Sequence, residues 1–158
     1  MLKIPSKRSL YLSIALSVIF SLVCIAGAFI MPTLAEMLIN AKDSIGSRGG
    51  DITETGRAFV LVLAYLVLAI VMLADVLLFF LLMRVRNGNV FTSQSVALIR
   101  GVAWCCLILA LVFLGLGIYF QLALIVAFLA AFLGLSLRVV KNVIEEATEI
   151  KSENDLTV

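Results

Sequence analysis

Apolar and polar residues alternate in large blocks along this chain. Almost all hydrophobic residues fall into four long stretches, which cover residues 9–31, 58–83, 102–119 and 122–140. Each stretch is near or above the length with which a helix crosses about 30 Å of hydrocarbon. Unpaired backbone groups are prohibitive in lipid, so each stretch is predicted to be helical. The pattern predicts an all-α fold, an integral membrane four-helix bundle built as a single membrane domain.

The connections between these stretches are short and differ in charge. The first loop, residues 32–57, holds three cations, whereas the other nine of the 12 Lys and Arg residues lie in the N-terminus, in the loop 84–101 and towards the tail 141–158. Because cytoplasmic segments carry the excess of Lys and Arg, both termini are expected in the cytoplasm, with 32–57 as the outer loop. The third and fourth stretches meet around Phe120 and Gln121, so they must form an antiparallel hairpin.

The first stretch follows a basic N-terminus, as a cleaved signal peptide would. Its apolar run extends over residues 9–31, whereas the apolar region of a signal peptide has about 7–15 residues. We therefore interpret it as a retained membrane anchor.

Composition narrows the classes of function. Charged residues make up 14% of the chain, against about 25% in soluble domains, which fits an outer surface that faces lipid. The net charge of +2 and the lack of a basic run argue against direct binding of nucleic acid. The sequence has no His and no metal-ligand spacing of Cys, and it shows no nucleophile elbow or phosphate-binding loop. We expect no cofactor, no metal and no enzymatic activity.

Asp75 is the one acidic side chain inside the four stretches. It lies about 12 Å along the helix from the predicted cytoplasmic end, where a charge costs a few kcal/mol. One interpretation is structural, either an ion pair with Arg84 or Arg100 or a protonated, hydrogen-bonded carboxyl. The other is a proton or ligand site.

The loop 84–101 has the signals of an ordered segment. Gly88 lies in a strong turn sequence, and Phe91 and Thr92 follow it. Thr92 suits the N-cap of a helix, and Phe91 and Val96 occupy the two positions of a hydrophobic staple. This helix is predicted to enter the third stretch with Arg100 at the membrane boundary.

The tail continues with apolar residues at helical spacing, which predicts a short cytoplasmic C-terminal helix. Its polar face carries Glu145, Glu146 and Glu149, whereas a helix on anionic lipid is basic there. We expect this helix to pack on protein, either on Arg84 and Arg86 or on a second copy of the chain.

Small residues recur every four positions on two stretches, a spacing that lets helix backbones approach closely. Either these stripes pack inside the bundle or they form the seam of a homodimer. They consist of Ser13, Ser17 and Ser21 on the first stretch, and of Ala123, Ala127 and Ala131 on the fourth.

Two segments carry a family resemblance. One is residues 86–92 (RNGNVFT), followed by Val96, Leu98, Ile99, Arg100 and Trp104, and the other is the ending 153–158 (ENDLTV). On these residues the chain resembles the four-span bacterial membrane proteins grouped as domain of unknown function 2975. The resemblance implies a multi-pass protein of the bacterial inner membrane. It also implies a regulatory pairing with a cytoplasmic helix-turn-helix regulator, because genes of the family often lie beside small regulators of the Cro/CI type. Asp75 is not among the residues that carry the resemblance.

These observations favour a non-enzymatic membrane protein, embedded in the lipid bilayer, that regulates or senses through a cytoplasmic partner. The ending offers a docking surface in Asn154, Asp155 and Leu156, with Leu156 as its large apolar side chain. The alternative is a small transporter or a membrane-peptide immunity protein.

Overall fold

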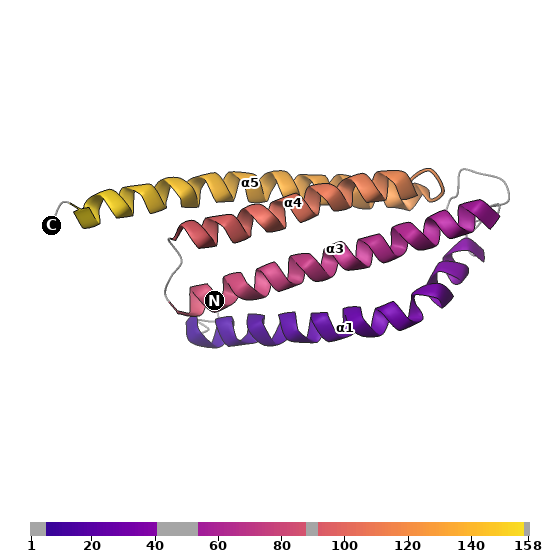
Figure 1. The fold of residues 1–158 in the computed structure, drawn as a ribbon, viewed down its shortest axis with the longest axis horizontal. Helices are drawn as coiled ribbons and strands as arrows, with labels where there is room; N and C mark the ends of the chain where they lie inside the picture. Colours follow the sequence, from indigo (N-terminus) through magenta and orange to yellow (C-terminus); the bar gives the residue numbers. More distant parts are fainter. Residues whose placement is uncertain (1–5, 41–53, 88–91, 157–158) are drawn as a thin grey trace, which may run out of the picture.

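The computed structural model describes residues 6–40, 54–87 and 92–156, which form four helices (Figure 1). They are α1 (Ser6–Asn40), α3 (Glu54–Arg86), α4 (Ser93–Leu116) and α5 (Gln121–Leu156). All four are long and apolar enough to cross a membrane. The predicted all-α four-helix bundle is therefore confirmed, and the chain is a multi-pass membrane protein.

Each helix runs antiparallel to the next and packs along it, so that α3 lies between α1 and α4, and α5 lies against α4 (Figure 1). In the α4–α5 hairpin, Gly134 of α5 lets the backbones of the two helices approach closely. A Cβ atom at Gly134 would lie 2.9 Å from Leu107 Cγ and 3.2 Å from the carbonyl oxygen of Ala103. The hairpin predicted from the short connection at Phe120 is present.

Helix α1 extends beyond the predicted first stretch, with Pro32 inside it. Proline lacks the N–H of the helical hydrogen bond and crowds the preceding turn, which accounts for the bend near the end of α1 in Figure 1. The bend brings Ile39 against Val60 of α3 and Phe120 of the hairpin turn, where the three form a buried apolar cluster.

The expected short C-terminal helix is not a separate element. Helix α5 runs without a break from Gln121 to Leu156 and ends past the start of α4 (Figure 1). We call its polar part, residues 141–156, the projecting segment. After Gly134 the helix contains neither Gly nor Pro, and its residues keep their helical spacing beyond the apolar stretch. The fourth apolar stretch and the tail therefore form one continuous helix.

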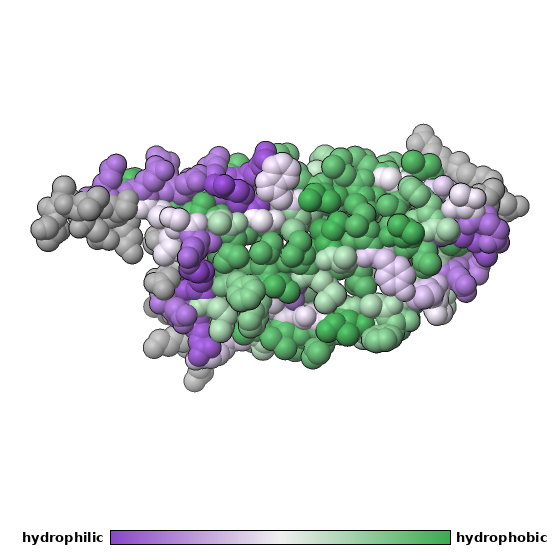
Figure 2. Space-filling view, viewed as in Figure 1, coloured by the Kyte–Doolittle hydropathy of each residue, from purple (hydrophilic) through white to green (hydrophobic). Residues whose placement is uncertain are grey.

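Polar residues gather at the two ends of the molecule, on either side of a broad apolar band (Figure 2). At one end α1 begins and α5 ends (Figure 1). We call this the basic end, because it carries Arg84, Arg86, Arg100, Arg138 and Lys141.

Candidate functional site

Asp75 lies on α3 and faces α1, with 8% of its surface exposed. The hydroxyl of Ser17 donates a hydrogen bond of 2.8 Å to its Oδ1 atom. Ser17 is the middle member of the serine stripe, so at this point the stripe packs inside the bundle. Of the two structural alternatives, the ion pair with Arg84 or Arg100 is not the one found, because Arg84 donates to Gln94 and Arg100 pairs with Glu145. The alternative of a hydrogen-bonded carboxyl is the arrangement found.

Two cavities flank this pair, and both Asp75 and Ser17 line each of them. The larger, of about 530 Å³, also contacts Ser13 and is otherwise apolar, with walls from α1, α3 and α4. The smaller, of about 270 Å³, contacts Ser21 and the ring of Phe80. A carboxyl and a hydroxyl between apolar walls can bind a proton or an amphipathic molecule with a cationic group.

The start of α4 has the predicted cap. Thr92 has extended backbone angles (φ −140°, ψ 148°), and its side chain accepts a 3.3 Å hydrogen bond from the backbone N–H of Ser95. Ser95 and Val96 are buried. The N-cap at Thr92 is confirmed. Gly88 and Phe91 lie outside the described residues, so the turn and the staple stay predictions.

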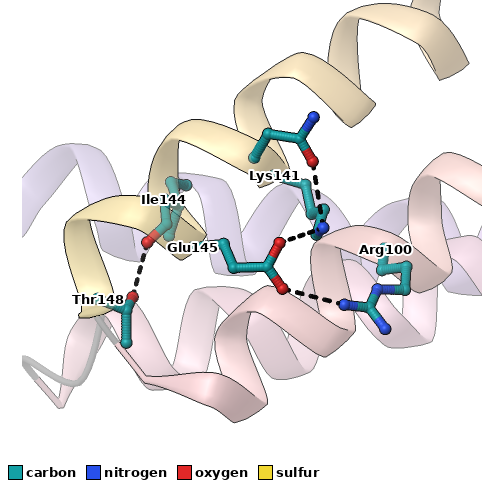
Figure 3. A network of polar contacts seen from close by, with 6 residues as sticks. Arg100, Lys141, Ile144, Glu145 and Thr148 are labelled. Atoms are coloured by element: carbon teal, nitrogen blue, oxygen red, sulfur yellow. Dashed lines mark hydrogen bonds and ion pairs between the residues drawn. The ribbon is translucent and has the colours of Figure 1, made fainter.

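Arg100 joins α4 to α5 at the basic end (Figure 3). Its guanidinium lies 3.2 Å from Glu145 Oε1, and Lys141 contacts the other carboxylate oxygen. The hydrogen bond from Lys141 holds the pKa of Glu145 below its ordinary value, and the charges of Lys141 and Arg100 act in the same direction. The tail therefore meets the body through Arg100 rather than through Arg84 and Arg86. Arg86 instead lies 5.0 Å from the ring centre of Tyr11.

From residue 141 onwards, α5 carries two exposed faces of different character. Val143 and Ile150 are large apolar residues with 60% and 54% of their surface exposed. Glu146, Glu149 and Glu153 are exposed as well. Asn154, Asp155 and Leu156 lie on the same helix, and their side chains lie outside the description.

Sequence reasoning did not single out Arg138, which lies inside the fourth apolar stretch. Its guanidinium carbon lies 4.9 Å from the ring centre of Trp104 on α4. The signal was present: Trp104 follows Arg100 by four residues and Lys141 follows Arg138 by three, so each pair shares a helix face. Within the described ranges, no three His, Cys, Asp or Glu side chains gather into a metal-binding group.

Comparison with known families finds one model, described as a protein of unknown function (DUF2975), that matches residues 4–158. The match spans nearly the whole chain and confirms the resemblance noted in the sequence. Comparison with curated proteins found no match, and neither did comparison with solved structures.

Proposed function

Because this chain belongs to the family described as a protein of unknown function (DUF2975), we propose its role from the arrangement of its helices. The protein acts as a non-enzymatic regulator or sensor in the bacterial inner membrane. The α1–α3 pair takes the signal, and the projecting part of α5 contacts a cytoplasmic partner. A helix-turn-helix regulator is the class of partner we propose first.

The projection of α5 is the observation that carries this proposal. The polar part of α5, residues 141–156, ends beyond the start of α4 (Figure 1) and exposes the apolar side chains of Val143 and Ile150 next to a row of glutamates. Exposed apolar stripes on helices commonly dock into a groove of another protein. The acidic face favours a basic partner surface, which DNA-binding proteins have.

A series of polar contacts connects the α1–α3 pair to the projecting segment of α5, and it supports transmission of a signal between them. Arg84 near the end of α3 donates to Gln94 on α4, and Arg100 on α4 pairs with Glu145 on α5. A shift of α3 against α1 would move Arg84, and hence the start of α4 and the base of the projecting segment. The proposed signal is a change at the Asp75–Ser17 contact.

The orientation rests on the excess of Lys and Arg at the basic end. A topology reporter fused after residue 49 should indicate an outside location, and one fused after residue 155 should indicate a cytoplasmic location. An outside signal at residue 155 would contradict the cytoplasmic docking surface.

Photocrosslinking in cells of the native host tests the contact itself. A photoreactive amino acid replaces Ile150 on the projecting segment or, as a control, Ile125, an exposed apolar residue of the spanning part of α5. We expect one defined protein adduct from position 150 and none from position 125. Val143→Glu, which charges the same stripe, should weaken the adduct at unchanged abundance. Lipid adducts alone at both positions would contradict a partner on this face.

Removal of residues 153–158 tests the ending separately. We expect normal abundance in the membrane together with loss of the adduct at position 150. If the shortened protein disappears from the membrane, the ending is required for folding rather than docking.

A small transporter is the second candidate, and the cavities beside Asp75 favour it. A buried carboxyl open to two cavities resembles the intramembrane acids of proton-coupled transport. Asp75→Asn keeps the shape and removes the charge. Normal abundance and normal phenotype in this variant would exclude the transport hypothesis, whereas loss of phenotype at normal abundance would support it.

A further inference from the structure

A further cavity lies at the basic end, between α4 and α5. Its volume is about 240 Å³, and its lining consists of Arg100, Trp104, Arg138, Lys141 and Asn142. Three cations therefore share one small hollow, and we call it the basic pocket. Its chemistry differs from that of the cavities beside Asp75, which are lined mainly by apolar side chains.

The charge in the basic pocket is only partly neutralised. Glu145 contacts both Arg100 and Lys141, and it is the carboxylate found beside these cations. Arg138 contacts the face of Trp104. Among the residues that the structure describes, no side chain or backbone oxygen accepts a hydrogen bond from its guanidinium. Glu145 thus neutralises two of the three cations in part, and the third, the Arg138 guanidinium with its five N–H donors, is held in place by an aromatic ring.

The position of the pocket indicates where its ligand comes from. Arg138 lies at the end of the fourth apolar stretch, and Trp104 is the type of residue that marks the membrane–water interface. On α4, Ile108 and Leu111 continue the face of Trp104 and are exposed, Leu111 by 67%. An anion bound in the pocket would therefore have an apolar surface directly below it.

We propose that the basic pocket binds the phosphate of an anionic phospholipid. The phosphate accepts hydrogen bonds from Arg138, with Arg100 and Lys141 supplying further positive charge. The acyl chains lie along the apolar face below Trp104. This geometry uses the polar pocket and the apolar face together, which inorganic phosphate cannot do. Basic pockets between spanning helices are a recurring form of binding site for anionic headgroups.

Trp104 makes a direct test practical, because it is the only tryptophan of the chain. The full-length protein is placed in phosphatidylcholine vesicles that contain a minor fraction of brominated lipid, which quenches nearby tryptophan fluorescence. Brominated phosphatidylglycerol is compared with brominated phosphatidylcholine at the same fraction. We expect the anionic lipid to quench Trp104 more strongly. Equal quenching by the two lipids would overturn the proposal.

Arg138→Gln removes the central donor and should lower the preference for phosphatidylglycerol about fivefold, the equivalent of one interfacial cation. Arg86→Gln is the matched control, because Arg86 also stacks on an aromatic ring at the basic end but lies outside the pocket. An equal fall in both variants would show a general surface charge effect and overturn the site. The ratio of the two lipids within each variant cancels changes in intrinsic fluorescence.

Three further measurements separate lipid binding at this site from misfolding and from binding of free phosphate. Arg138→Lys keeps the charge without the planar donors, so its preference for phosphatidylglycerol should lie between those of the parent protein and Arg138→Gln. The unfolding midpoint of Arg138→Gln in detergent is also measured, because a misfolded variant would show an altered midpoint. Inorganic phosphate is then added against chloride at equal ionic strength. We expect no difference between the two salts. Loss of the lipid preference in phosphate alone would assign the pocket to the free anion and overturn the lipid proposal.

Discussion

The α4–α5 hairpin and the α1–α3 pair span the same membrane but pack very differently. Helix α4 buries a row of residues along its length, among them Val102, Ala103 and Cys105, whereas the buried residues of the longer α3 are Gly56, Val60 and Asp75. Glycine shows the same contrast. A Cβ at Gly134 would press on the backbone of α4, but at Gly27 on α1 the nearest atom, in Leu68, is 4.0 Å away.

This difference indicates a division of roles. The hairpin is close-packed and can hold the projecting part of α5 in a fixed direction. The α1–α3 pair is joined at its centre by a polar contact with cavities on both sides. A close-packed interface resists change, whereas a contact beside open space can rearrange at low cost. We therefore place the adjustable part of the molecule in the α1–α3 pair.

The largest effect is expected from a methyl group added inside the hairpin. Gly134→Ala should lower the free energy of unfolding by about 3 kcal/mol, the upper range for overpacking, because the Ala103 carbonyl cannot move aside. Gly27→Ala is the control and should leave stability unchanged or slightly higher, since alanine favours the helix. Unfolding midpoints in detergent measure both. Equal stability of the two variants would contradict the contrast in packing.

Loss of the polar contact in the α1–α3 pair should have the next largest effect. Ser17→Ala removes the hydroxyl that donates to Asp75 and should cost about 1.5 kcal/mol. Ser21→Ala, on the same face of α1 and lining the smaller cavity, should change stability by less than about 0.5 kcal/mol. The same unfolding assay applies. If both variants behave alike, the hydrogen bond does not join the helices.

Thr92→Ala tests the cap that fixes the start of the hairpin. The loss of the hydrogen bond to Ser95 should cost about 1 kcal/mol. It should also speed protease cutting after Arg86 in inside-out vesicles, because the first turn of α4 frays. Ser93→Ala, an exposed neighbour, serves as the control. Unchanged cutting in Thr92→Ala would show that the cap does not order this segment.

The smallest effect concerns Glu145 at the base of the projecting segment. Its pKa is lowered in the folded protein, chiefly by the hydrogen bond from Lys141. The contribution of Glu145 to the free energy of unfolding is therefore complete above the ordinary carboxyl pKa, and it is lost as the pH falls through the lowered pKa. Stability of the parent protein and of Glu145→Gln, measured from neutral to acidic pH, should differ slightly at neutral pH and converge in acid. A difference that persists in acid would contradict the ion pair with Arg100.

Much of this fold could be predicted from one sequence, because spanning helices follow from the length and polarity of local segments. The cap at Thr92 is equally local, since donor and acceptor are three residues apart. The partner of Asp75 could not be predicted from the sequence. Arg84 and Arg100 follow Asp75 at the same end of the bundle and suggested an ion pair. The actual partner, Ser17, depends on how α1 is rotated about its axis relative to α3. The separate C-terminal helix was expected because polarity changes near residue 141, but a change in polarity does not interrupt backbone hydrogen bonding.

Two native cysteines measure the proposed contrast directly. Cys24 on α1 and Cys105 on α4 are almost equally buried, with 6% and 4% of their surface exposed. In membranes, single-cysteine proteins that retain one or the other are treated with a membrane-permeant maleimide, and labelling after denaturation sets the maximum. If the α1–α3 pair opens and the hairpin does not, Cys24 is labelled faster than Cys105. Equal rates, or faster labelling of Cys105, would contradict the assignment of the adjustable part to α1 and α3.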